Sequence, residues 1–550
     1  MKNNITFLFI SAMLVLLIPT TDINAQSIIK ADSLIFCLPG ELWWGGIVNK
    51  GEQMPFGKKS FSFNFFANDD GNQSSPLLIS NRGRYIWSEK PFRFNFRSDS
   101  LIIDKAYGEI YFGQKGSTLR IAYKDVSERF FPASGSTPDD LLFSAPQYNL
   151  WIELMYNPNQ KDVLEYASQV LKNGLPPGVI MIDDNWTSYY GQFDFDRKKF
   201  PDPKQLIDQL HLMGFKVMLW VCPFISADSE PFRKLSRQRL LLGDNSGNND
   251  GQRDRNTRPL ILNWWNGYSA CLDLSNPAAA DWLKERLDFL QTEYGVDGFK
   301  FDAGDAFFYN NPNMVSFKTL LPNEHSMLWA EIGLAYSLNE YRAMWKMGGK
   351  PLAERLRDKN HSWEDVQKLI PHILSAGLLG YPFSCPDMIG GGELGSFSGT
   401  RGKQLDQELI VRSAQCQALM PMMQFSAAPW RVLDSLHLEA VRKAVALRMQ
   451  FTPVIMKLAK QSSQTGEPIV RHLEYVFPDQ GFTETKDAFM LGDSILVVPA
   501  LQKGATSLTV KLPRILKSKW KSDEGKIYKG GTTIQIDVPL DRLPYFEIVK

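Results

Sequence analysis

The sequence contains few of the residues that bind metals or form disulfide frameworks. Its five cysteines lie at positions 37, 222, 271, 385 and 416, and no two have the short spacing of a zinc site. An odd number of cysteines also argues against a disulfide framework. The six histidines are sparse, and none pair at an H-x-x-x-H spacing. We therefore predict no metal site and no cofactor.

An excess of charge of either sign is also missing. The 61 basic and 60 acidic residues give a formal net charge of +1. A balanced chain gives no reason to expect nucleic acid or an anionic membrane surface as a partner. Internal repeats and low-complexity runs are absent as well. None of these features predicts an oligomeric state.

The N-terminal apolar run is too short for a membrane anchor. Residues 1–26 read MKNNITFLFISAMLVLLIPTTDINAQ, with Lys2 as a basic start, an apolar stretch over 5–19 and a sequence close to A-x-A at 23–25. This pattern predicts a secretory signal over residues 1–25. No cysteine stands at the cleavage point, which argues against a lipoprotein. We expect an exported chain, periplasmic or secreted, without a membrane anchor. The alternative is a buried N-terminal strand.

Three segments of different character follow. Residues 26–146 are predicted to form an antiparallel β-sandwich, because short alternating apolar runs are separated by turn signals: SFSFNFFAN, RYIWSE, RFNFRS and LRIAYKDV. Residues 147–434 alternate strand-like runs (NLWIELMY, GVIMIDDNW, KVMLWVCPF, GVDGFKFDAG) with helix-like stretches such as KDVLEYASQVLKNG and AAADWLKERLDFLQTEYG. That alternation predicts an α/β fold with a central (β/α)₈ barrel. Residues 435–550 begin with a helical stretch and are then β-rich: DSILVVPAL, SLTVKLP, TTIQIDV.

Charged side chains follow several of the predicted barrel strands. The run GVDGFKFDAGDAFF at 295–308 starts like a buried strand and ends with Lys300, Asp302 and Asp305. GVIMIDDNW likewise ends in Asp183 and Asp184. Active sites of such barrels lie at the C-terminal ends of the strands, so these side chains are predicted to meet in one catalytic mouth. A single Asp at a strand end is more often a loop cap, but several at successive strands favour a site.

Carboxylates, basic residues and tryptophans without a metal cluster are typical of glycoside hydrolysis. That chemistry needs two carboxyl groups on either side of an oxocarbenium-like transition state. Further polar groups bind the sugar hydroxyls, and aromatic rings stack on the sugar faces. The sequence therefore favours an enzyme that acts on an oligosaccharide or glycoside.

The chain resembles glycoside hydrolase family 31 through almost all of its length after the leader. VDGFKFDAGD is similar to the family's nucleophile motif, and the resemblance implies Asp302 as nucleophile and Lys300 as a contact to substrate and nucleophile. Asp305 stands where many members have Glu. MIDDNW resembles the second barrel strand, which implies that Asp183 or Asp184 binds sugar hydroxyls. KVMLWVCPFI resembles the third strand, and Trp220 within it is a further predicted substrate contact.

The resemblance also implies an acid/base residue. Many members carry the acid in a W-x-G-D-N-x-x-x-W motif, and the nearest match here is RLRDKNHSWEDV, which lacks the Gly. It implies Asp358 as acid/base, against the alternative of an exposed Asp in a charged loop. Sixteen residues earlier, Arg342 matches a position at which members often have a substrate-contacting Arg. The alternative for Arg342 is a surface position.

Within the family, the sequence resembles the branch that contains the mammalian myogenesis-regulating glycosidase. The stretches that carry this are GYPFSCPDMIGGG, RDKNHSW, WWNGYSACLDLSNP and MMQFSAAPWR. Glucosidase members usually have Arg-x-His where this chain has Gln424-Phe425-Ser426, and the branch implies an α-galactoside substrate. Trp265, Trp151 and Asp387 are further predicted substrate contacts. For either Trp, core packing is the alternative.

The mechanism implied is that of a retaining exo-α-glycosidase, with Asp302 ionised and Asp358 protonated. Retention predicts carboxyl groups about 5–5.5 Å apart. Lys300 is expected to keep Asp302 charged. Three alternatives stay open: an α-glucosidase or α-xylosidase, a non-catalytic sugar-binding protein on the same barrel, and a lyase or transglycosylase that uses the same pocket.

Overall fold

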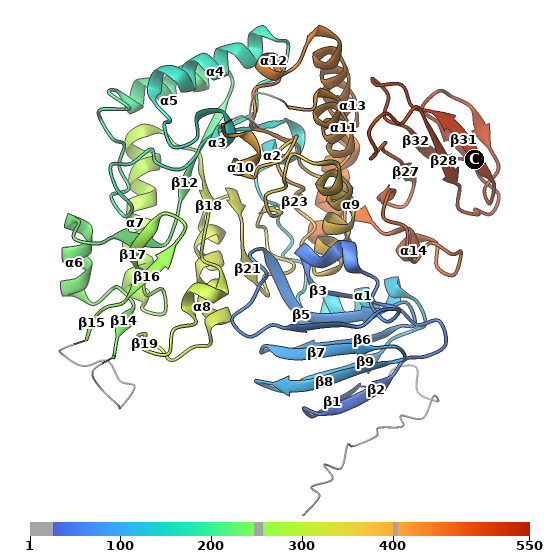
Figure 1. Cartoon of the computed structure of the whole chain (residues 1–550), viewed down its shortest axis with the longest axis horizontal. Helices are drawn as coiled ribbons and strands as arrows, with labels where there is room; N and C mark the ends of the chain where they lie inside the picture. The colour runs from blue at the N-terminus through green and yellow to red at the C-terminus, as the bar shows by residue number, and fades with distance from the viewer. Residues whose placement is uncertain (1–25, 247–256, 400–404) are drawn as a thin grey trace, which may run out of the picture.

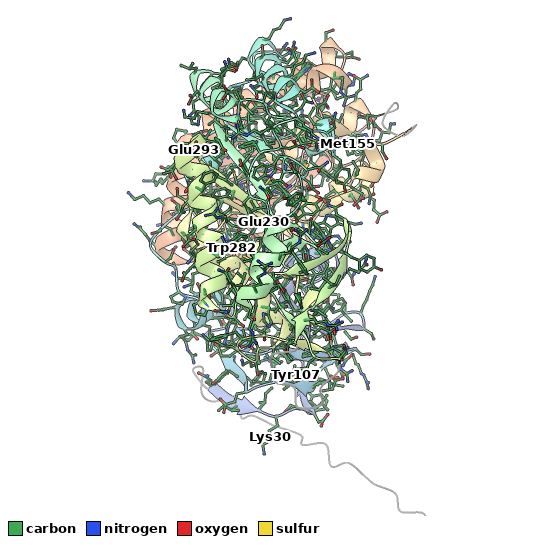
Figure 2. The ribbon with its side chains drawn as sticks, turned by 90° about the vertical axis from the view of Figure 1, so that its left-hand side faces the viewer. Lys30, Tyr107, Met155, Glu230, Trp282 and Glu293 are labelled. Carbon is green, nitrogen blue, oxygen red and sulfur yellow. The ribbon has the colours of Figure 1, made fainter. Side chains whose placement is uncertain are left out.

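A computed structural model describes residues 26–246, 257–399 and 405–550. The predicted signal at residues 1–25 lies outside these ranges. Figure 1 shows the barrel at the centre, the N-terminal sheets below it in blue and the C-terminal sheets beside it in red. Figure 2 shows the molecule from the side, with Lys30 and Tyr107 of the N-terminal sheets at one end and Trp282 and Glu293 of helix α7 higher on the barrel.

The centre of the molecule is a parallel barrel of eight strands. Their spatial order is β23-β22-β20-β18-β12-β11-β10-β24. A parallel bridge between Met388 and Gln424 joins the two ends of this order, and the Ile389 amide donates to the Gln424 carbonyl at 2.7 Å. The strands are β10 (Gln147–Asn149), β11 (Val179–Ile182), β12 (Lys216–Val221), β18 (Gly298–Phe301), β20 (Leu338–Tyr341), β22 (Glu354–Arg355), β23 (Ser384–Cys385) and β24 (Gln424–Phe425). The predicted (β/α)₈ barrel is confirmed.

Helices cover the outside of the barrel. The longer ones are α4 (Gln160–Lys172), α5 (Pro203–Leu212), α6 (Glu230–Gln238), α7 (Pro277–Tyr294), α8 (Pro322–Ile332), α9 (Trp363–Leu378), α11 (Gln407–Ala418) and α13 (Ser435–Thr465). Short turns of helix are α2 (Leu141–Ser144), α3 (Trp151–Leu154), α10 (Leu394–Phe397), α12 (Pro429–Val432), α14 (Leu473–Val476) and the 3₁₀ helices η1 (Val48–Gln53), η2 (Ala306–Tyr309) and η3 (Gly333–Ala335).

Helix α7 shows how the sequence defines these elements. The Asn276 side chain caps the first turn by accepting from the Ala278 amide at 3.1 Å, and Pro277 occupies the first position, where no donor is lost. Gly295 ends the helix in a left-handed conformation with φ 83°. The buried side chains recur every three or four residues: Ala279, Leu283, Leu287, Leu290 and Tyr294.

Two sheets form the N-terminal sandwich, and within residues 26–114 their strands pair antiparallel, as predicted, while β21 adds to one edge in parallel. One has the order β2-β8-β7-β4, and the other has the order β1-β9-β6-β5-β21 with β3 paired to β5. Phe65, Phe92, Phe94 and Phe96 are among the aromatic side chains packed between them. The strands are β1 (Gln26–Ile29), β2 (Ser33–Phe36), β3 (Trp43–Ile47), β4 (Phe61–Asn64), β5 (Gln73–Ser80), β6 (Arg84–Ser88), β7 (Phe92–Arg97), β8 (Ser100–Ala106), β9 (Ile110–Gln114) and β21 (Met344–Trp345).

The run LRIAYKDV is a helix, and its prediction as a strand is wrong. It forms the first two turns of α1 (Leu119–Phe130). Apolar residues at 119, 121 and 123 imitate the alternation of a strand, but Ile121 is 46% exposed. The buried positions are Leu119, Ala122, Tyr123 and Val126, which have the spacing of one helix face.

The run NLWIELMY is also only partly a strand. Strand β10 ends at Asn149, and Trp151–Leu154 turns into the short helix α3. The Asn149 side chain accepts from the Trp151 amide at 2.9 Å, which satisfies a backbone donor where the strand ends. Met155 then ends this short helix with a positive φ of 51°.

The N-terminal sandwich is joined to the barrel close to the strand ends. Strand β21, which follows barrel strand β20, pairs with β5 of the sandwich. The buried side-chain amides of Asn72 and Gln73 both donate to the Arg342 carbonyl at 2.9 Å. The sandwich therefore fixes the backbone of a predicted site residue.

The remaining strands form small sheets in barrel loops and a C-terminal domain. The loop strands are β13 (Phe224–Ser226), β14 (Gly243–Asp244), β15 (Arg258–Pro259), β16 (Ile261–Trp264), β17 (Gly267–Cys271) and β19 (Met314–Val315). The C-terminal strands are β25 (Val470–Arg471), β26 (Phe489–Leu491), β27 (Ile495–Val497), β28 (Ser507–Lys511), β29 (Lys519–Ser522), β30 (Ile527–Tyr528), β31 (Thr533–Asp537) and β32 (Tyr545–Val549), packed around Trp520 and Phe546. Within the described residues, no helix has the length and apolar character needed to cross a bilayer.

Candidate active site

Nine of the ten predicted site residues line one cavity of about 280 Å³ at the C-terminal ends of the barrel strands. Asp183 and Asp184 directly follow β11, Asp302 follows β18, and Asp358 lies three residues after β22. Because parallel strands end at one rim of a barrel, side chains far apart in sequence meet there. The nine are Trp151, Asp183, Asp184, Trp220, Trp265, Lys300, Asp302, Arg342 and Asp358.

Asp302 is held in place by two hydrogen-bond donors and one ion pair. Its Oδ2 accepts from the Trp220 indole at 2.8 Å, and its Oδ1 accepts from the Ala303 amide at 2.8 Å. The Arg342 Nε lies 3.8 Å from the same Oδ1. Burial disfavours the ionised carboxyl, but the cations of Lys300, Arg342 and Arg355 outweigh it and lower the pKa of Asp302 below its ordinary value. This carboxyl is therefore ionised at neutral pH.

Lys300 and Asp183 form a buried ion pair at the floor of the cavity. The Lys300 Nζ lies 2.6 Å from the Asp183 Oδ2, and both side chains are almost completely buried. Burial alone would favour neutral Lys300, but the charge of Asp183 raises the pKa of the amine overall. Lys300 is therefore cationic at neutral pH, and its direct partner is Asp183.

Asp184 lies beside this pair with a different electrostatic character. Its carboxylate accepts from Tyr190 at 3.1 Å and from Asn266 at 2.7 Å. Burial, followed by the negative charge of Asp183, raises the pKa of Asp184 to about 7. Near neutral pH, Asp184 is present in both protonation states. The ionised carboxylate accepts a hydrogen bond and the protonated carboxyl donates one, and a sugar hydroxyl can pair with either.

Asp358 is a more accessible carboxyl of the cavity than Asp302. Its side chain is 31% exposed and contacts the guanidinium of Arg355, whose side chain is only 2% exposed. The charged residues next to it in sequence, Arg357 and Lys359, are not its ion-pair partners in the structure. The cation that faces Asp358 is therefore Arg355.

Asp387 is the one predicted substrate contact that does not line the cavity. It is completely buried behind Arg355, at 3.3 Å from that guanidinium, and accepts from the Lys359 amide at 2.6 Å. The prediction of direct substrate binding is therefore corrected. Strand β23 ends two residues before Asp387, and the chain turns there at φ 131°, which directs the carboxyl into the wall of the site.

Aromatic side chains form the outer walls of the cavity. Trp265, in the β16–β17 hairpin, is 45% exposed and lies under the Arg342 guanidinium, 4.8 Å from ring centroid to Cζ. Trp151 packs edge-on against Tyr156 at 5.1 Å on another side. These rings offer apolar faces of the kind on which sugar rings stack.

Sequence reasoning missed five residues that line the same cavity: Tyr156, Arg355, Met388, Glu393 and Leu394. Arg355 carried a usable signal, because it is a basic residue three positions before Asp358. Tyr156 and Glu393 come from loops and Leu394 begins the short helix α10, and the positions of these segments depend on contacts that a sequence pattern does not encode.

Gln424, on which the predicted sugar specificity depended, is completely buried in β24 and does not line the cavity. Its amide donates to Glu340 at 2.6 Å and to Gln147 at 2.7 Å. Ser426 is also completely buried. Gln424 therefore belongs to a polar layer inside the barrel, below the cavity.

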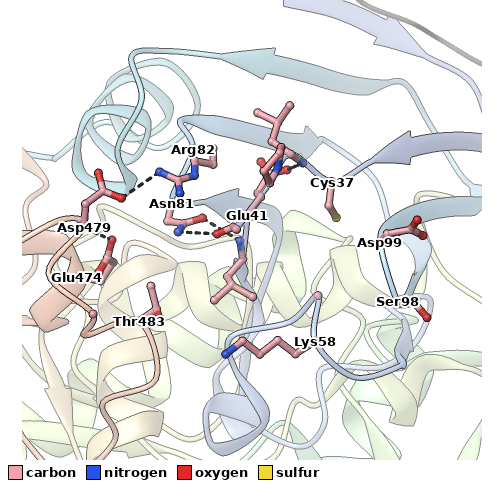
Figure 3. A pocket seen from close by; sticks show the side chains of 16 residues that line it. Cys37, Glu41, Lys58, Asn81, Arg82, Ser98, Asp99, Glu474, Asp479 and Thr483 are labelled. Atoms are coloured by element: carbon pink, nitrogen blue, oxygen red, sulfur yellow. Dashed lines mark hydrogen bonds and ion pairs between the residues drawn. The ribbon is translucent and has the colours of Figure 1, made fainter.

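A larger cavity of about 660 Å³ lies between the N-terminal sandwich and the C-terminal domain (Figure 3). An ion pair between Arg82 and Asp479 crosses it at 3.0 Å. None of the described side chains that line it is aromatic, so it offers no stacking surface for a sugar. Within the described ranges, no group of His, Cys, Asp and Glu is arranged to hold a metal ion. The barrel cavity is therefore the candidate active site.

The chain is similar to several known proteins. The chain is 32% identical over 445 residues to the myogenesis-regulating glycosidase of Mus musculus, covering 78% of this chain and 60% of that protein. It is 29% identical to the SITS-binding protein of Tetronarce californica, covering 59% of this chain and 46% of that protein. The chain thus spans about half to three fifths of the length of these curated relatives.

Solved structures and family models identify the fold and the family. A dextranase of Flavobacterium johnsoniae, solved with glucose, matches with a TM-score of 0.81 at 20% identity, over 94% of this chain and 67% of that one. At this identity the likeness shows the fold. The model of the glycosyl hydrolases family 31 TIM-barrel domain matches residues 143–458, and that of the family's C-terminal domain matches residues 466–547. The chain therefore belongs to glycoside hydrolase family 31.

Proposed function

We propose that the protein is a retaining exo-α-glycosidase that removes terminal α-linked sugars, with α-galactosides as its substrates. The observation that carries this proposal is the pair of unlike carboxyl groups in one cavity. Asp302 is buried, hydrogen-bonded and kept ionised by cations, whereas Asp358 is the more accessible carboxyl of the same cavity. Glycosidases divide the work between two such groups.

The reaction proceeds in two displacements. Asp302 attacks the anomeric carbon, the glycosidic C–O bond breaks, and Asp358 gives its proton to the departing oxygen. Asp358 then takes a proton from water, whose oxygen attacks the same carbon and releases the Asp302 carboxylate. Arg342, beside Asp302 and above Trp265, would orient the sugar, and Asp183 and Asp184 would bind its hydroxyls.

The size of the cavity supports action on a terminal sugar. At about 280 Å³ it is at the lower end of ordinary ligand pockets, which hold roughly 300–1,000 Å³. The buried Lys300–Asp183 pair closes its floor. A site of this shape suits one terminal ring, with the aglycone toward the rim at Glu393 and Leu394.

The sugar is proposed from the sequence at 424–426. The chain has Gln424 and Ser426 where glucosidase members usually have Arg and His, so the sugar contacts expected of a glucosidase are missing there. Other relatives are named alpha-glucosidase 2, of Bacillus thermoamyloliquefaciens, and alpha-xylosidase, of Emericella nidulans. An α-glucosidase or α-xylosidase is therefore the alternative within the same mechanism.

A non-catalytic sugar-binding protein is the second candidate function. The observation that favours it is the contact between Arg355 and Asp358, because a neighbouring cation favours the ionised form of a carboxyl. A general acid must instead hold a proton. Binding of a sugar without hydrolysis would distinguish this candidate from the enzyme.

The test is hydrolysis of p-nitrophenyl α-galactoside, α-glucoside, α-xyloside and α-N-acetylgalactosaminide by the wild type, Asp302→Asn and Asp358→Asn. We expect release from the galactoside that both substitutions abolish or strongly reduce. Release from the glucoside or xyloside would overturn the choice of sugar but keep the mechanism. A wild type that binds a sugar by calorimetry and hydrolyses none of the panel would overturn the enzyme proposal.

We also propose that the chain is exported, on the pattern of residues 1–25. Expression in a Gram-negative host, with the mature N-terminus sequenced, tests this. A processed chain that starts near residue 26, in the periplasm or medium, is expected. An unprocessed cytoplasmic chain would contradict the proposal.

A further inference from the structure

We propose that Asp387 is a positioning residue for the acid/base Asp358 and acts on it through Arg355. The inference rests on the proposed function and deepens it, because it concerns how the acid keeps its proton. Asp387 does not line the cavity and does not touch the substrate in this account. Its place in the reaction is indirect.

The geometry is a bridge of one cation between two carboxylates. The Nη1 of Arg355 contacts the Oδ1 of Asp358 and lies 3.3 Å from the Oδ1 of Asp387. Arg355 and Asp387 are both buried, while Asp358 faces the cavity. A Cβ added at Gly392 would meet the same two oxygens, at 2.8 Å from Asp358 and 2.9 Å from Asp387. The two carboxyl groups therefore lie on either side of one small glycine.

Asp387 is held rigidly in this position. Its Oδ2 accepts from the Lys359 amide at 2.6 Å, so the buried carboxyl is tied to the segment that carries Asp358. Its backbone has φ 131°, a conformation that L side chains rarely adopt. Strained non-glycine residues of this kind are concentrated at functional sites. The fold keeps an aspartate where a glycine would be less strained.

Other charged groups face the bridge from every neighbouring element. Glu340 of β20 lies 3.6 Å from the Arg355 Nε and partly compensates its charge. Lys300 and Asp302 at β18, Arg342 after β20, and Lys359 beside Asp358 also act on it electrostatically. Asp387 is the negative group that shares the same guanidinium nitrogen with Asp358.

Two effects of Asp387 favour a proton on Asp358. Its negative charge also pairs with the Arg355 guanidinium, so that Asp358 is not the only counter-ion of that cation. It also repels a negative charge on Asp358 directly. The same repulsion appears at Asp387, where burial, followed by the charge of Asp358, raises the pKa to about 7. Because the two carboxyls share one guanidinium nitrogen, a charge on either one disfavours a charge on the other.

The test is the pH profile of kcat/KM for Asp387→Asn on the best p-nitrophenyl glycoside and on the alkyl glycoside of the same sugar. Removal of the Asp387 charge leaves Arg355 to stabilise ionised Asp358. We expect the alkaline limb to move to lower pH by about one unit or more. We also expect a larger loss on the alkyl glycoside, whose poor leaving group depends on the acid.

The matched control is Glu354→Gln. Glu354 is a buried carboxyl next to Arg355 whose pKa is raised far above its ordinary value by burial, so it is already neutral and its replacement removes no charge. If Asp387→Asn does not fold, Arg355→Gln tests the bridge from the other side, and its alkaline limb should move to higher pH.

Failure of the inference and failure of the proposed function give different results. A wild type that hydrolyses no glycoside would overturn the proposed function. A wild type with a pH-dependent rate, and an Asp387→Asn profile that superimposes on it, would overturn the inference alone. Equal shifts in Asp387→Asn and Glu354→Gln would also overturn it, since they would show a general structural effect.

Discussion

At the scale of single residues, the site depends on a carboxylate that stays charged inside the protein. Asp302 is buried, and burial alone would neutralise it. The Trp220 hydrogen bond and the surrounding cations reverse that tendency. Removal of any of these partners should raise the pKa of Asp302 and so raise the pH below which activity is lost.

Trp220→Phe removes the 2.8 Å hydrogen bond to Asp302 and keeps a smaller aromatic ring. Hydrogen bonds to charged groups contribute about 1.5–3 kcal/mol, so we expect kcat/KM to fall about ten- to a hundredfold. The hydrogen bond lowers the pKa of Asp302, and without it the acid limb should move to higher pH. The control is Trp264→Phe, which removes a hydrogen bond to Ser269 outside the cavity lining. An unchanged acid limb in Trp220→Phe would contradict the assignment.

Lys300→Met should destabilise the protein more than the double variant Lys300→Met/Asp183→Asn. The single change leaves Asp183 charged and unpaired in a buried site, which costs about 3–5 kcal/mol. The double change removes both charges and avoids most of that penalty. Urea denaturation of the three proteins measures the difference. Equal destabilisation of both variants would show that the pair is not electrostatically coupled.

At the scale of elements, the glycine-rich loop after β23 packs directly against the Asp358 and Asp387 carboxyl groups. Gly392→Ala would place a methyl group 2.8–2.9 Å from the Asp358 and Asp387 oxygens. Overpacking of this kind costs about 1–3 kcal/mol, and it would displace the acid. We expect kcat/KM to fall at least about tenfold with a lowered Tm.

Gly395→Ala is the matched control three residues further on. A Cβ there meets only the Glu393 Oε1, at 3.9 Å, which is ordinary van der Waals contact. We expect activity and Tm close to the wild type. Equal effects at the two glycines would mean that the loop tolerates no side chain at all, whatever its distance from the carboxyls.

Elements with a strong periodic signal could be predicted from the sequence, and short ones could not. Helix α7 has a cap, a first-turn proline, a terminal glycine and a regular buried face. The segment over α1 was mistaken because Leu119, Ile121 and Tyr123 alternate as in a strand, and only tertiary packing exposes Ile121. Residues that directly follow barrel strands, such as Asp302, could be predicted to lie in the cavity, because parallel strands end at one rim of the barrel. Asp387 was predicted there too, but a backbone turn with φ 131° directs its carboxyl into the wall instead.

At the scale of the whole molecule, the N-terminal sandwich takes part in building the site. Asn72 and Gln73 donate to the Arg342 carbonyl, and Asp69 accepts from the Ala306 amide at 2.7 Å behind the nucleophile loop. These contacts join residues more than 200 positions apart. No local pattern in the sequence indicates them.

Asn72→Ala should therefore reduce both stability and activity. It removes one of the two buried donors to the Arg342 carbonyl, and Gln73 still donates, so we expect a loss of about 0.5–1.5 kcal/mol together with a looser backbone beside Asp302. Thermal unfolding and kcat/KM measure the two effects. Loss of stability with kcat/KM unchanged would show that the sandwich supports the barrel without orienting Arg342.

The measurement that tests the central claim most directly is covalent trapping of the nucleophile. The protein is incubated with α-glycosyl fluorides of galactose, glucose and xylose that carry a second fluorine to slow release, and the labelled peptide is sequenced by mass spectrometry. The account predicts one added sugar, on the peptide that contains Asp302, and no label in Asp302→Asn. A label on another carboxylate, or none on a protein that hydrolyses the α-glycoside of the same sugar, would contradict it.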